Sequence, residues 1–170
     1  FDVDSLEIVE KVELSRPVYP GSGTVRLGRF FESYDEPYAL TFLFNSTDPT
    51  TGRGMMGVAR FDFSDRSLDY FETNPSVGLG DFAVSPDGKR AYGVRNAVDQ
   101  HEIYEFDLEQ KRLVRKQAYE GRPRTSLKVS SDGQKVYLHH AGNTIDYFDA
   151  ETLMFEKRVE LPADFTARMI

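Results

Sequence analysis

The stretch SPDGKRAYGV, from Ser85 to Val94, decides the fold because a close copy, SSDGQKVYLH, begins 45 residues later at Ser130. In the first copy Pro86 presets the backbone for a turn, and Gly88 supplies a residue that tolerates positive φ. The second copy keeps the Asp-Gly pair although the proline is absent. Apolar residues alternate on both sides of each turn, which predicts a hairpin of two half-buried strands.

A second landmark, the dipeptide Phe-Asp, recurs in step with the first. It opens FDVDSLEIVEK at Phe1, FDFSDRSLDYF at Phe61, FDLEQKRLVRK at Phe106 and FDAETLMFEKR at Phe148, at spacings of 60, 45 and 42 residues. Two landmarks with a shared period of about 40–45 residues are typical of a β-propeller with four strands per blade. No segment shows helical periodicity with capping residues. The predicted fold class is therefore all-β, a propeller of four-stranded antiparallel blades.

The repeat divides the chain into three blades, over residues 24–73, 81–120 and 126–161, with residues 1–14 as the outer strand of a preceding blade. In each blade strand a precedes the Asp-Gly turn, strand b follows it, strand c ends at Phe-Asp and strand d comes last. The long first spacing is attributed to a loop insertion, Asn45–Gly54, between strands b and c. Closed propellers have roughly 4–8 blades, so we expect further blades before Phe1.

Composition and charge exclude several classes of function. A net charge of −7 argues against a nucleic-acid partner, because phosphate binding needs a basic surface, and favours a cationic or neutral partner. The chain has no cysteine, which excludes disulfides, thiolate metal sites and haem attachment through a C-x-x-C-H motif. No apolar run reaches the length of a transmembrane helix, so membrane insertion is not predicted. Because the chain starts at Phe1, without an initiator Met, we expect it to be a mature or excised piece of a longer protein.

Function is expected on the propeller face that carries the longer loops. The a–b and c–d turns share one face and are short, whereas the d–a and b–c loops share the other, and loops concentrate function. These loops are Pro17–Gly23, Asn45–Gly54, Asn74–Gly80, Asn96–Gln100, Gly121–Thr125 and Ala141–Asn143. The residues expected to face a substrate or partner are Arg122, Arg124, Asn96, His101, His140 and Asn143.

The two arginines of this set have a functional and a plain interpretation. Arg122 and Arg124 flank Pro123 just before a strand a. The functional interpretation is a clamp for an anion or a carboxylate. The plain one, which we favour, is a pair of solvated loop arginines or an arginine that pairs with the next blade.

The three histidines support neither a metal site nor a catalytic residue. His101 lies with Asp99 in a polar b–c loop, where it fits a general base, although a surface histidine is the simpler interpretation. His139 and His140 are adjacent in a strand. Their side chains point to opposite faces and do not readily chelate one ion. No catalytic residue and no metal ligand is therefore predicted.

The order of these motifs resembles the C-terminal half of the β subunit of quinohemoprotein amine dehydrogenase, a seven-bladed propeller. The match runs through FDVDSLEIVEK, STDPTTGRG, FDFSDRSLDYF, FAVSPDGKRAYGV, EFDLEQKRLVRK, LKVSSDGQKVYL and DYFDAETLMFEKRVELP, and covers nearly all 170 residues. Similar Asp-Gly and Asp-Ala-Glu-Thr turns occur in YVTN and YncE-like propellers and in relatives of the methylamine dehydrogenase heavy chain, which form the wider group.

The resemblance implies a periplasmic complex of three subunits in which this chain is a non-catalytic propeller scaffold. A small separate subunit carries cysteine tryptophylquinone and the catalytic carboxylate, and a di-haem cytochrome c subunit carries haem c and removes electrons. The propeller holds the small subunit and helps to wall the amine pocket. This chain, which has no Cys and no Trp from which to form such a quinone, is expected to bind no cofactor itself.

Two other functions remain open at this stage. The same turns fit a YVTN/YncE-like secreted propeller that works as a binding module without redox partners. An autonomous lactonase-like or hydrolase-like propeller enzyme would need axial Glu, Asn, Asp and His ligands to a metal. The placement of the three histidines disfavours that enzyme.

Overall fold

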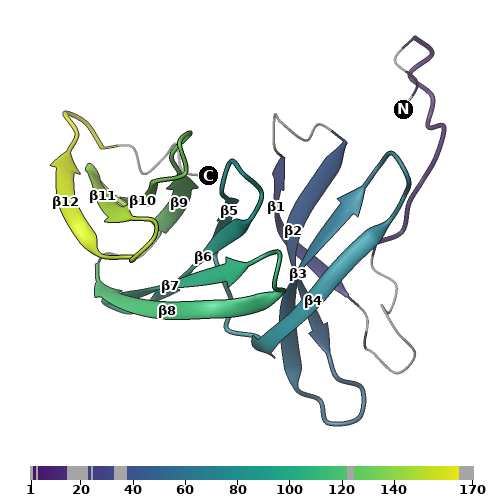
Figure 1. Cartoon of the computed structure of the whole chain (residues 1–170), viewed down its shortest axis with the longest axis horizontal. Coiled ribbons are helices and arrows are strands. Elements are labelled where there is room, and N and C mark those ends of the chain that lie inside the picture. Colours follow the sequence, from purple (N-terminus) through teal and green to yellow (C-terminus); the bar gives the residue numbers. More distant parts are fainter. Residues whose placement is uncertain are drawn as a thin grey trace.

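The chain folds into three separate four-stranded antiparallel sheets (Figure 1). The computed structural model describes residues 2, 4–14, 23, 25–32, 38–121 and 125–164, and every structural statement below concerns these residues. They contain no helix, and hence no helix long and apolar enough to cross a membrane. The prediction of an all-β fold made of four-stranded antiparallel blades is confirmed.

Each sheet is a meander in which the strands pair in chain order. Blade 1 consists of β1 (Arg26–Glu32), β2 (Ala39–Thr47), β3 (Gly54–Asp62) and β4 (Leu68–Pro75). Blade 2 consists of β5 (Asp81–Val84), β6 (Arg90–Ala97), β7 (Gln100–Asp107) and β8 (Arg112–Glu120). Blade 3 consists of β9 (Thr125–Val129), β10 (Lys135–His140), β11 (Thr144–Asp149) and β12 (Phe155–Glu160).

The blades are arranged side by side around their first strands. Strand β5 contacts both β1 and β9, so the three innermost strands adjoin one another. Strands β4, β8 and β12 lie at the outer edges of the sheets (Figure 1). This is the radial arrangement of a propeller, in which each blade packs its faces against its neighbours.

The Asp-Gly pairs form the turns between the first two strands of blades 2 and 3. Gly88 has a φ of 69° and Gly133 a φ of 73°, in the region that favours glycine. The aspartate before each glycine accepts a hydrogen bond from the serine that starts the motif, at 2.6 Å for Ser85 and 2.5 Å for Ser130. The repeated sequence therefore encodes a repeated turn.

The Phe-Asp dipeptide ends the third strand of every blade and starts a second repeated turn. The residue four positions after each aspartate has positive φ, 61° at Arg66, 53° at Lys111 and 56° at Leu153. Leu6 repeats the pattern with a φ of 57°, and the Asp2 carboxylate accepts a hydrogen bond from the backbone of Ser5 at 2.8 Å. The N-terminal segment thus has the same turn, although residues 4–14 form no strand in the described part of the chain.

The expected loop insertion in blade 1, Asn45–Gly54, is strand at both of its ends, and there the prediction is wrong. Strands β2 and β3 pair without interruption from Ala39 opposite Asp62 to Thr47 opposite Gly54. Only residues 48–53 lie outside the ladder, and the Asp48 carboxylate caps them by accepting a hydrogen bond from the backbone of Thr50 at 2.8 Å. Backbone pairing between two long strands outweighs the polar composition that indicated a loop.

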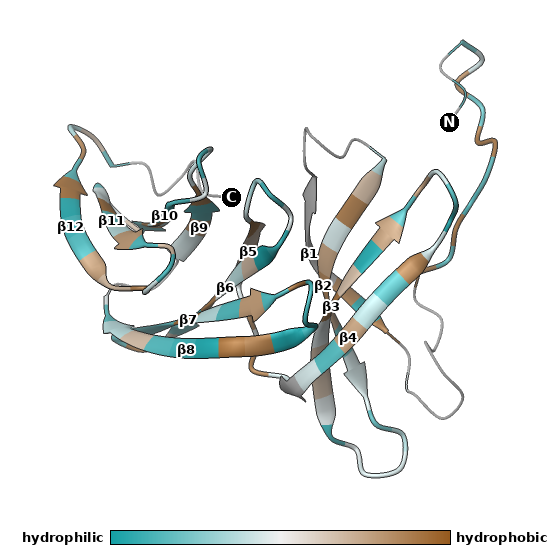
Figure 2. Ribbon diagram, in the orientation of Figure 1, coloured by the Kyte–Doolittle hydropathy of each residue, from teal (hydrophilic) through white to brown (hydrophobic). Residues whose placement is uncertain are grey.

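The core lies between the blades. One apolar cluster joins blades 1 and 2 and includes Met56, Val58, Phe82 and Phe106. A second joins blades 2 and 3 and includes Tyr92, Ile103, Leu127, Leu138 and Phe148. Hydrophobic residues accordingly interrupt the hydrophilic stretches along the blade strands (Figure 2).

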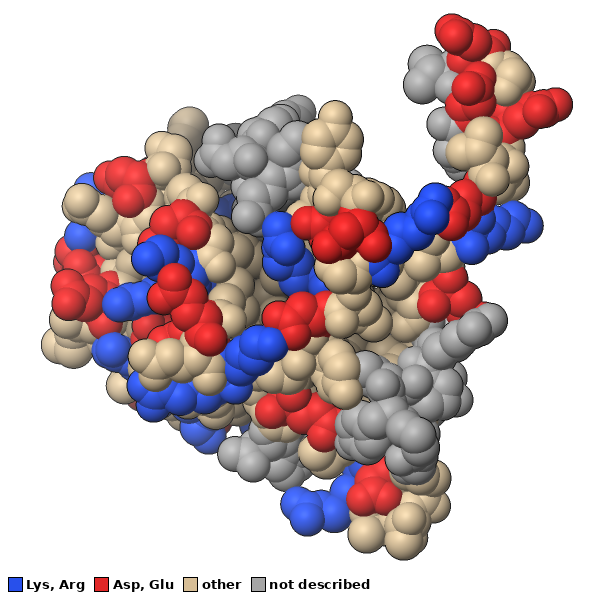
Figure 3. Space-filling view, turned by 45° about the vertical axis from the view of Figure 1, so that its right-hand side comes forward, with Lys and Arg blue, Asp and Glu red and all other residues tan. Residues whose placement is uncertain are grey.

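The surface charge is mixed in sign. Acidic and basic side chains lie next to one another over most of the face shown in Figure 3. Several of the contacts are ion pairs between strands, such as Arg95 with Glu102 at 2.9 Å and Lys116 with Glu102 at 3.0 Å. The segment 4–14 projects from the blades, and most of its charged side chains are acidic (Figure 3).

Candidate functional site

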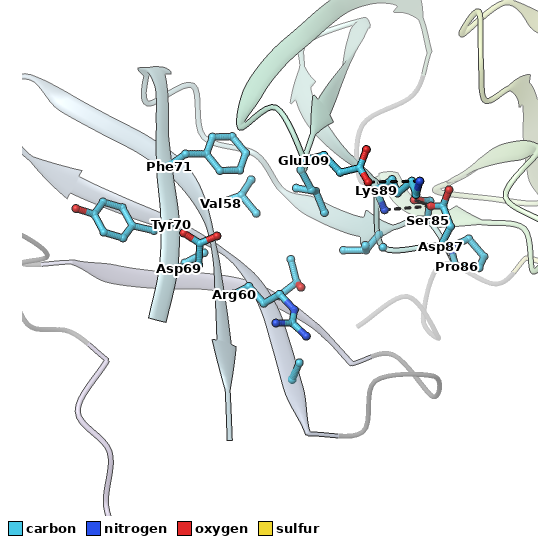
Figure 4. Close-up of a pocket in the computed structure, with 16 residues that line it drawn as sticks. Val58, Arg60, Asp69, Tyr70, Phe71, Ser85, Pro86, Asp87, Lys89 and Glu109 are labelled. Carbon is cyan, nitrogen blue, oxygen red and sulfur yellow. Dashed lines mark hydrogen bonds and ion pairs between the residues drawn. The ribbon is translucent and has the colours of Figure 1, made fainter. Parts of the chain in front are cut away.

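A groove of about 390 Å³ runs between blades 1 and 2 (Figure 4). Its lining includes the apolar residues Val58 and Phe71, and its charged residues include Lys89 and Glu109, which form an ion pair at 3.4 Å. The turn that contains Asp87 also lines it, so the groove opens on the face of the short turns. This is not the face on which the sequence predicts function.

The predicted face carries a cluster of polar residues at the seam between blades 2 and 3. The structure places Asn96 near the end of β6, His101 in β7, His140 at the end of β10 and Asn143 in the turn that follows. The rings of His101 and His140 lie 5.0 Å apart between centroids, across the seam. The other two predicted residues, Arg122 and Arg124, lie outside the described residues.

His101 is a buried histidine, and the interpretation as a surface histidine in a loop is wrong. Its side chain is 0% exposed. Its Nδ1 atom lies 3.1 Å from Asn96 Oδ1 and 3.1 Å from Thr125 Oγ1. The turn between β6 and β7 is tight, with Asp99 at a φ of 59°, so β7 starts at Gln100 and directs His101 into the seam.

His140 is also buried, at 2% exposure, and it is oriented by Asp146. Its Nε2 atom lies 2.8 Å from Asp146 Oδ2. The same carboxylate accepts hydrogen bonds from Arg158, from Nε at 2.6 Å and from Nη2 at 2.7 Å. His139, the next residue back along β10, is only partly buried, as the alternation of side chains in a strand requires.

The protonation state of Asp146 determines which nitrogen of His140 carries a hydrogen. Burial acts to raise the pKa of Asp146, but the hydrogen bonds from Arg158 and His140 outweigh it and lower the pKa to about 2. An ionised carboxylate only accepts hydrogen bonds, so Nε2 of His140 must be the donor. In the neutral ring Nδ1 then holds a lone pair. That atom is buried and has no hydrogen-bond partner in the described part of the chain.

Gly121 fits against both rings because it has no side chain. A Cβ atom there would lie 2.4 Å from Cδ2 and Nε2 of His101 and 3.2 Å from Cε1 of His140. The start of the d–a loop therefore packs directly on the histidine pair. Sequence reasoning named the loop Gly121–Thr125 but did not single out Gly121 and Thr125 as neighbours of His101, a contact that depends on how the blades pack. It missed Asp146 and Arg158, which are brought to His140 by strand pairing within blade 3.

A groove of about 310 Å³ adjoins His140 at this seam. It is lined by Glu120, Gly121, His140, Asn143, Thr144, Arg158 and Glu160. A second hollow of about 280 Å³ shares Glu120 and Arg158 with it and adds the aromatic rings of Tyr119, Phe148 and Phe155. The two hollows together offer acceptors at one end and aromatic surface at the other.

The seam is held together by direct contacts between the blades. Asp81 at the start of β5 accepts hydrogen bonds from Ser126 Oγ at 2.9 Å and from the backbone N–H of Leu127 at 2.8 Å. The hydroxyl of Tyr92 donates to the carbonyl of Ala150 at 3.0 Å. These contacts fix the two blades, and therefore the histidine pair, in one relative position.

The cluster is suited to binding a ligand. The described residues contain no group of three or more His, Cys, Asp or Glu side chains that could hold a metal ion. What the site offers is a buried acceptor, a fixed tautomer and a groove beside it. Those features suit a ligand that donates hydrogen bonds.

No protein-family model and no curated protein matches the chain. The fold, by contrast, has many counterparts among solved structures.

These structures support the propeller fold. Hydrazine synthase of Kuenenia stuttgartiensis aligns with a TM-score of 0.58 and 18% identity, over 93% of this chain and 40% of that chain. The β-propeller domain of the Trilobed protease from Pyrococcus furiosus aligns with a TM-score of 0.53 and 15% identity, over 81% and 43%. AztD from Citrobacter koseri aligns with a TM-score of 0.53 and 14% identity, over 84% and 36%. The chain thus spans less than half the length of the proteins it matches, and identities this low show the fold alone.

Proposed function

We propose that this chain is part of the propeller scaffold subunit of a periplasmic amine dehydrogenase that uses a quinone cofactor. In this proposal the face of the d–a and b–c loops holds the small quinone-bearing subunit and helps to wall the amine pocket. A di-haem cytochrome c subunit accepts the electrons. The cysteine tryptophylquinone and the haems belong to those partners.

The observation that carries the proposal is the ordered resemblance of the motifs, combined with their positions in the fold. Each Phe-Asp ends a third strand, at Phe61, Phe106 and Phe148. Each Asp-Gly lies in the first turn of its blade. Motifs that match the family in order therefore also have equivalent structural roles, which is what a shared propeller requires.

In this role the chain contributes rigidity and shape. The apolar clusters between blades and the hydrogen bonds of Asp81 fix the blades relative to one another. The loop-rich face then presents the groove beside His140 in a fixed geometry. A quinone formed from Cys and Trp cannot be built from the residues of this chain, which has neither, and in this proposal it belongs to the small subunit.

The test is to purify the full-length parent protein from its native host and record its visible absorption spectrum with and without a primary amine. We expect a small crosslinked subunit and a c-type cytochrome to co-purify, and haem bands to sharpen when the amine reduces the complex. A colourless protein without associated chains would overturn the proposal.

That second outcome would favour a secreted binding propeller of the YVTN/YncE type. The observation that supports this alternative is that residues of this chain line a groove beside His140. Neighbouring genes separate the two functions. A small subunit rich in Cys and Trp together with a C-x-x-C-H protein favours the dehydrogenase.

A further inference from the structure

The Nδ1 atom of His140 is a buried acceptor that nothing in the described chain satisfies. A buried polar group without a partner costs free energy, so native structures retain such groups mainly where they have a use. Because Nε2 donates to Asp146, Nδ1 is the nitrogen of the neutral ring that can accept a hydrogen bond from an incoming group. The adjoining groove of about 310 Å³ gives such a group a place to lie.

The described lining of this groove carries more acidic than basic side chains. Arg158 is the only basic residue among the described residues that line it, and its two hydrogen bonds go to Asp146, whose charge it balances. Glu120 and Glu160 also line the groove, and both are exposed. Two carboxylates and a neutral acceptor together favour a ligand that is cationic and carries several N–H donors.

The hollow that continues from the groove is aromatic. Phe148 lies 4.6 Å from Tyr119 and 5.7 Å from Phe155, measured between ring centroids. Aromatic faces attract cations and also pack well against the flat guanidinium group and its aliphatic stem. The site therefore combines a hydrogen-bond acceptor, two carboxylates and aromatic rings within one seam.

We propose that this seam receives an arginine side chain of a partner protein. The guanidinium would donate to His140 Nδ1 and pair with Glu120 and Glu160, while its stem lies along the aromatic hollow. Arginine is the basic residue most enriched at the centres of protein interfaces, and its five donors can serve three acceptors at once. The net charge of −7 favours a basic partner over an acidic one.

Other small ligands fit these groups less well. A lysine ammonium is a compact, strongly hydrated charge that lacks a flat face for the aromatic rings. A neutral sugar can stack on the rings and donate to His140, but it gains nothing from the two carboxylates. The proposal does not depend on which protein the partner is, and it holds for either function discussed above.

The test is a titration of the 170-residue chain with N-acetyl-L-arginine amide, monitored through the imidazole ¹⁵N and ¹H resonances of His140. In the free protein we expect the neutral tautomer with hydrogen on Nε2. Binding is expected to shift the Nδ1 resonance, with saturation in the millimolar range for a single side chain. N-acetyl-L-lysine amide and methyl glucoside are the comparison probes and should bind more weakly.

Surface variants distinguish binding at this groove from weak general attraction. The double variant Glu120→Gln and Glu160→Gln is expected to lower the affinity for the arginine amide about fivefold. The reason is that exposed ion pairs contribute only up to about 1 kcal/mol each. Glu109→Gln, in the groove between blades 1 and 2, is the matched control and should change nothing. All three positions are exposed, so the fold should be retained.

Three results would overturn the proposal. These are an unchanged His140 resonance at saturating arginine amide, equal or tighter binding of the lysine or sugar probe, and equal loss of affinity in the Glu109→Gln control. None of them bears on the amine dehydrogenase function, which is tested in the native complex by its spectrum.

Discussion

The two seams between the blades differ in how they are held. The seam between blades 2 and 3 combines an apolar cluster with polar contacts, namely the partly buried Asp81 hydrogen bonds and the buried pair His101 and His140. The seam between blades 1 and 2 has an apolar cluster and an exposed ion pair, Lys111 with Asp69 at 2.5 Å, and it leaves a groove on the face of the short turns. Polar contacts are costly to bury unless satisfied, so their presence at one seam indicates a place with a specific task.

Blades with the same strand order and the same turns therefore need not pack through the same kind of interface. The turns repeat because the same local sequence recurs, whereas the seams depend on residues from two blades that vary independently. The predictions below treat each seam as the control for the other. Each compares unfolding free energies, measured by chemical denaturation of the whole chain.

The largest contrast is expected between the two aspartates that bridge blades. Asp81→Ala removes two hydrogen bonds to a charged acceptor and leaves the backbone N–H of Leu127 without its partner, at a cost of about 3 kcal/mol. Asp69→Ala removes an exposed ion pair and should cost at most about 0.5 kcal/mol. Equal losses would show that the polar contacts do not distinguish the seams.

A matched pair of valines compares the apolar parts of the seams. Val136 is fully buried between blades 2 and 3, whereas Val58 lines the groove between blades 1 and 2. Val136→Ala should cost about 2–3 kcal/mol, because the removed methyl groups leave a closed cavity. Val58→Ala should cost about 1 kcal/mol, because the enlarged space joins an existing groove. A larger loss at Val58 would contradict this view of the packing.

Acid should weaken the seam that contains the histidines. The pKa of Asp146 is about 2 in the folded chain and about 3.9 in an unfolded one, so the folded state holds this group ionised at lower pH. The ionised Asp146 carboxylate contributes about 2–3 kcal/mol to the free energy of unfolding above about pH 4, and this contribution is lost as pH falls toward 2. Asp146→Asn should therefore lower stability at pH 6 and flatten the decline between pH 5 and 2.

The parallel measurement on Glu102 tells the two networks apart. The hydrogen bond from Lys116, followed in size of effect by the one from Arg95, lowers the pKa of Glu102 to about 2. All three residues belong to blade 2. Glu102→Gln should flatten a separate part of the acid decline, and the double variant should show the sum of both effects because the two groups share no partner. Identical curves for Asp146→Asn and the parent chain would contradict the role assigned to Asp146.

Among the variants of the seam between blades 2 and 3, the smallest effect is expected at Gly121. Gly121→Ala forces the rings of His101 and His140 to shift, at a cost of about 1–2 kcal/mol, and should change the His140 imidazole resonances. Gly54→Ala is the control, because a Cβ there meets only the Ser76 side chain, at 3.3 Å. Unchanged imidazole resonances in Gly121→Ala would show that the loop does not pack on the histidine pair.

Local regularities made the fold predictable. Two kinds of turn repeat along the chain, one at SPDG and SSDG and one after each Phe-Asp dipeptide. Their φ values, as at Gly88 and Lys111, depend on residues within five positions in the sequence. The prediction failed at Asn45–Thr47, where polar residues form the end of β2 because β3 pairs with them. Composition alone does not reveal a distant backbone partner.

The sequence placed four of the six predicted site residues near strand ends, where the structure has them. Asn96, His101, His140 and Asn143 were named because they lie near the ends of strands on the loop-rich face. Their burial and their association across the seam were not predictable, since 38 residues separate the two histidines in the sequence.

The predicted difference in loop length between the two faces is wrong in blades 2 and 3, where the b–c connections, residues 98–99 and 141–143, are shorter than the a–b turns, residues 85–89 and 130–134. What the sequence does encode is the periodic part of this protein, the four-stranded blade and its two kinds of turn. Those features depend on residues close together in the chain, where φ preferences and short hydrogen bonds act. Three contacts depend on the tertiary structure: His101 lies against His140, Asp146 accepts a hydrogen bond from Nε2 of His140, and Gly121 packs on both rings. Such contacts depend on how two blades pack, and packing is settled by the fit of side chains from distant segments.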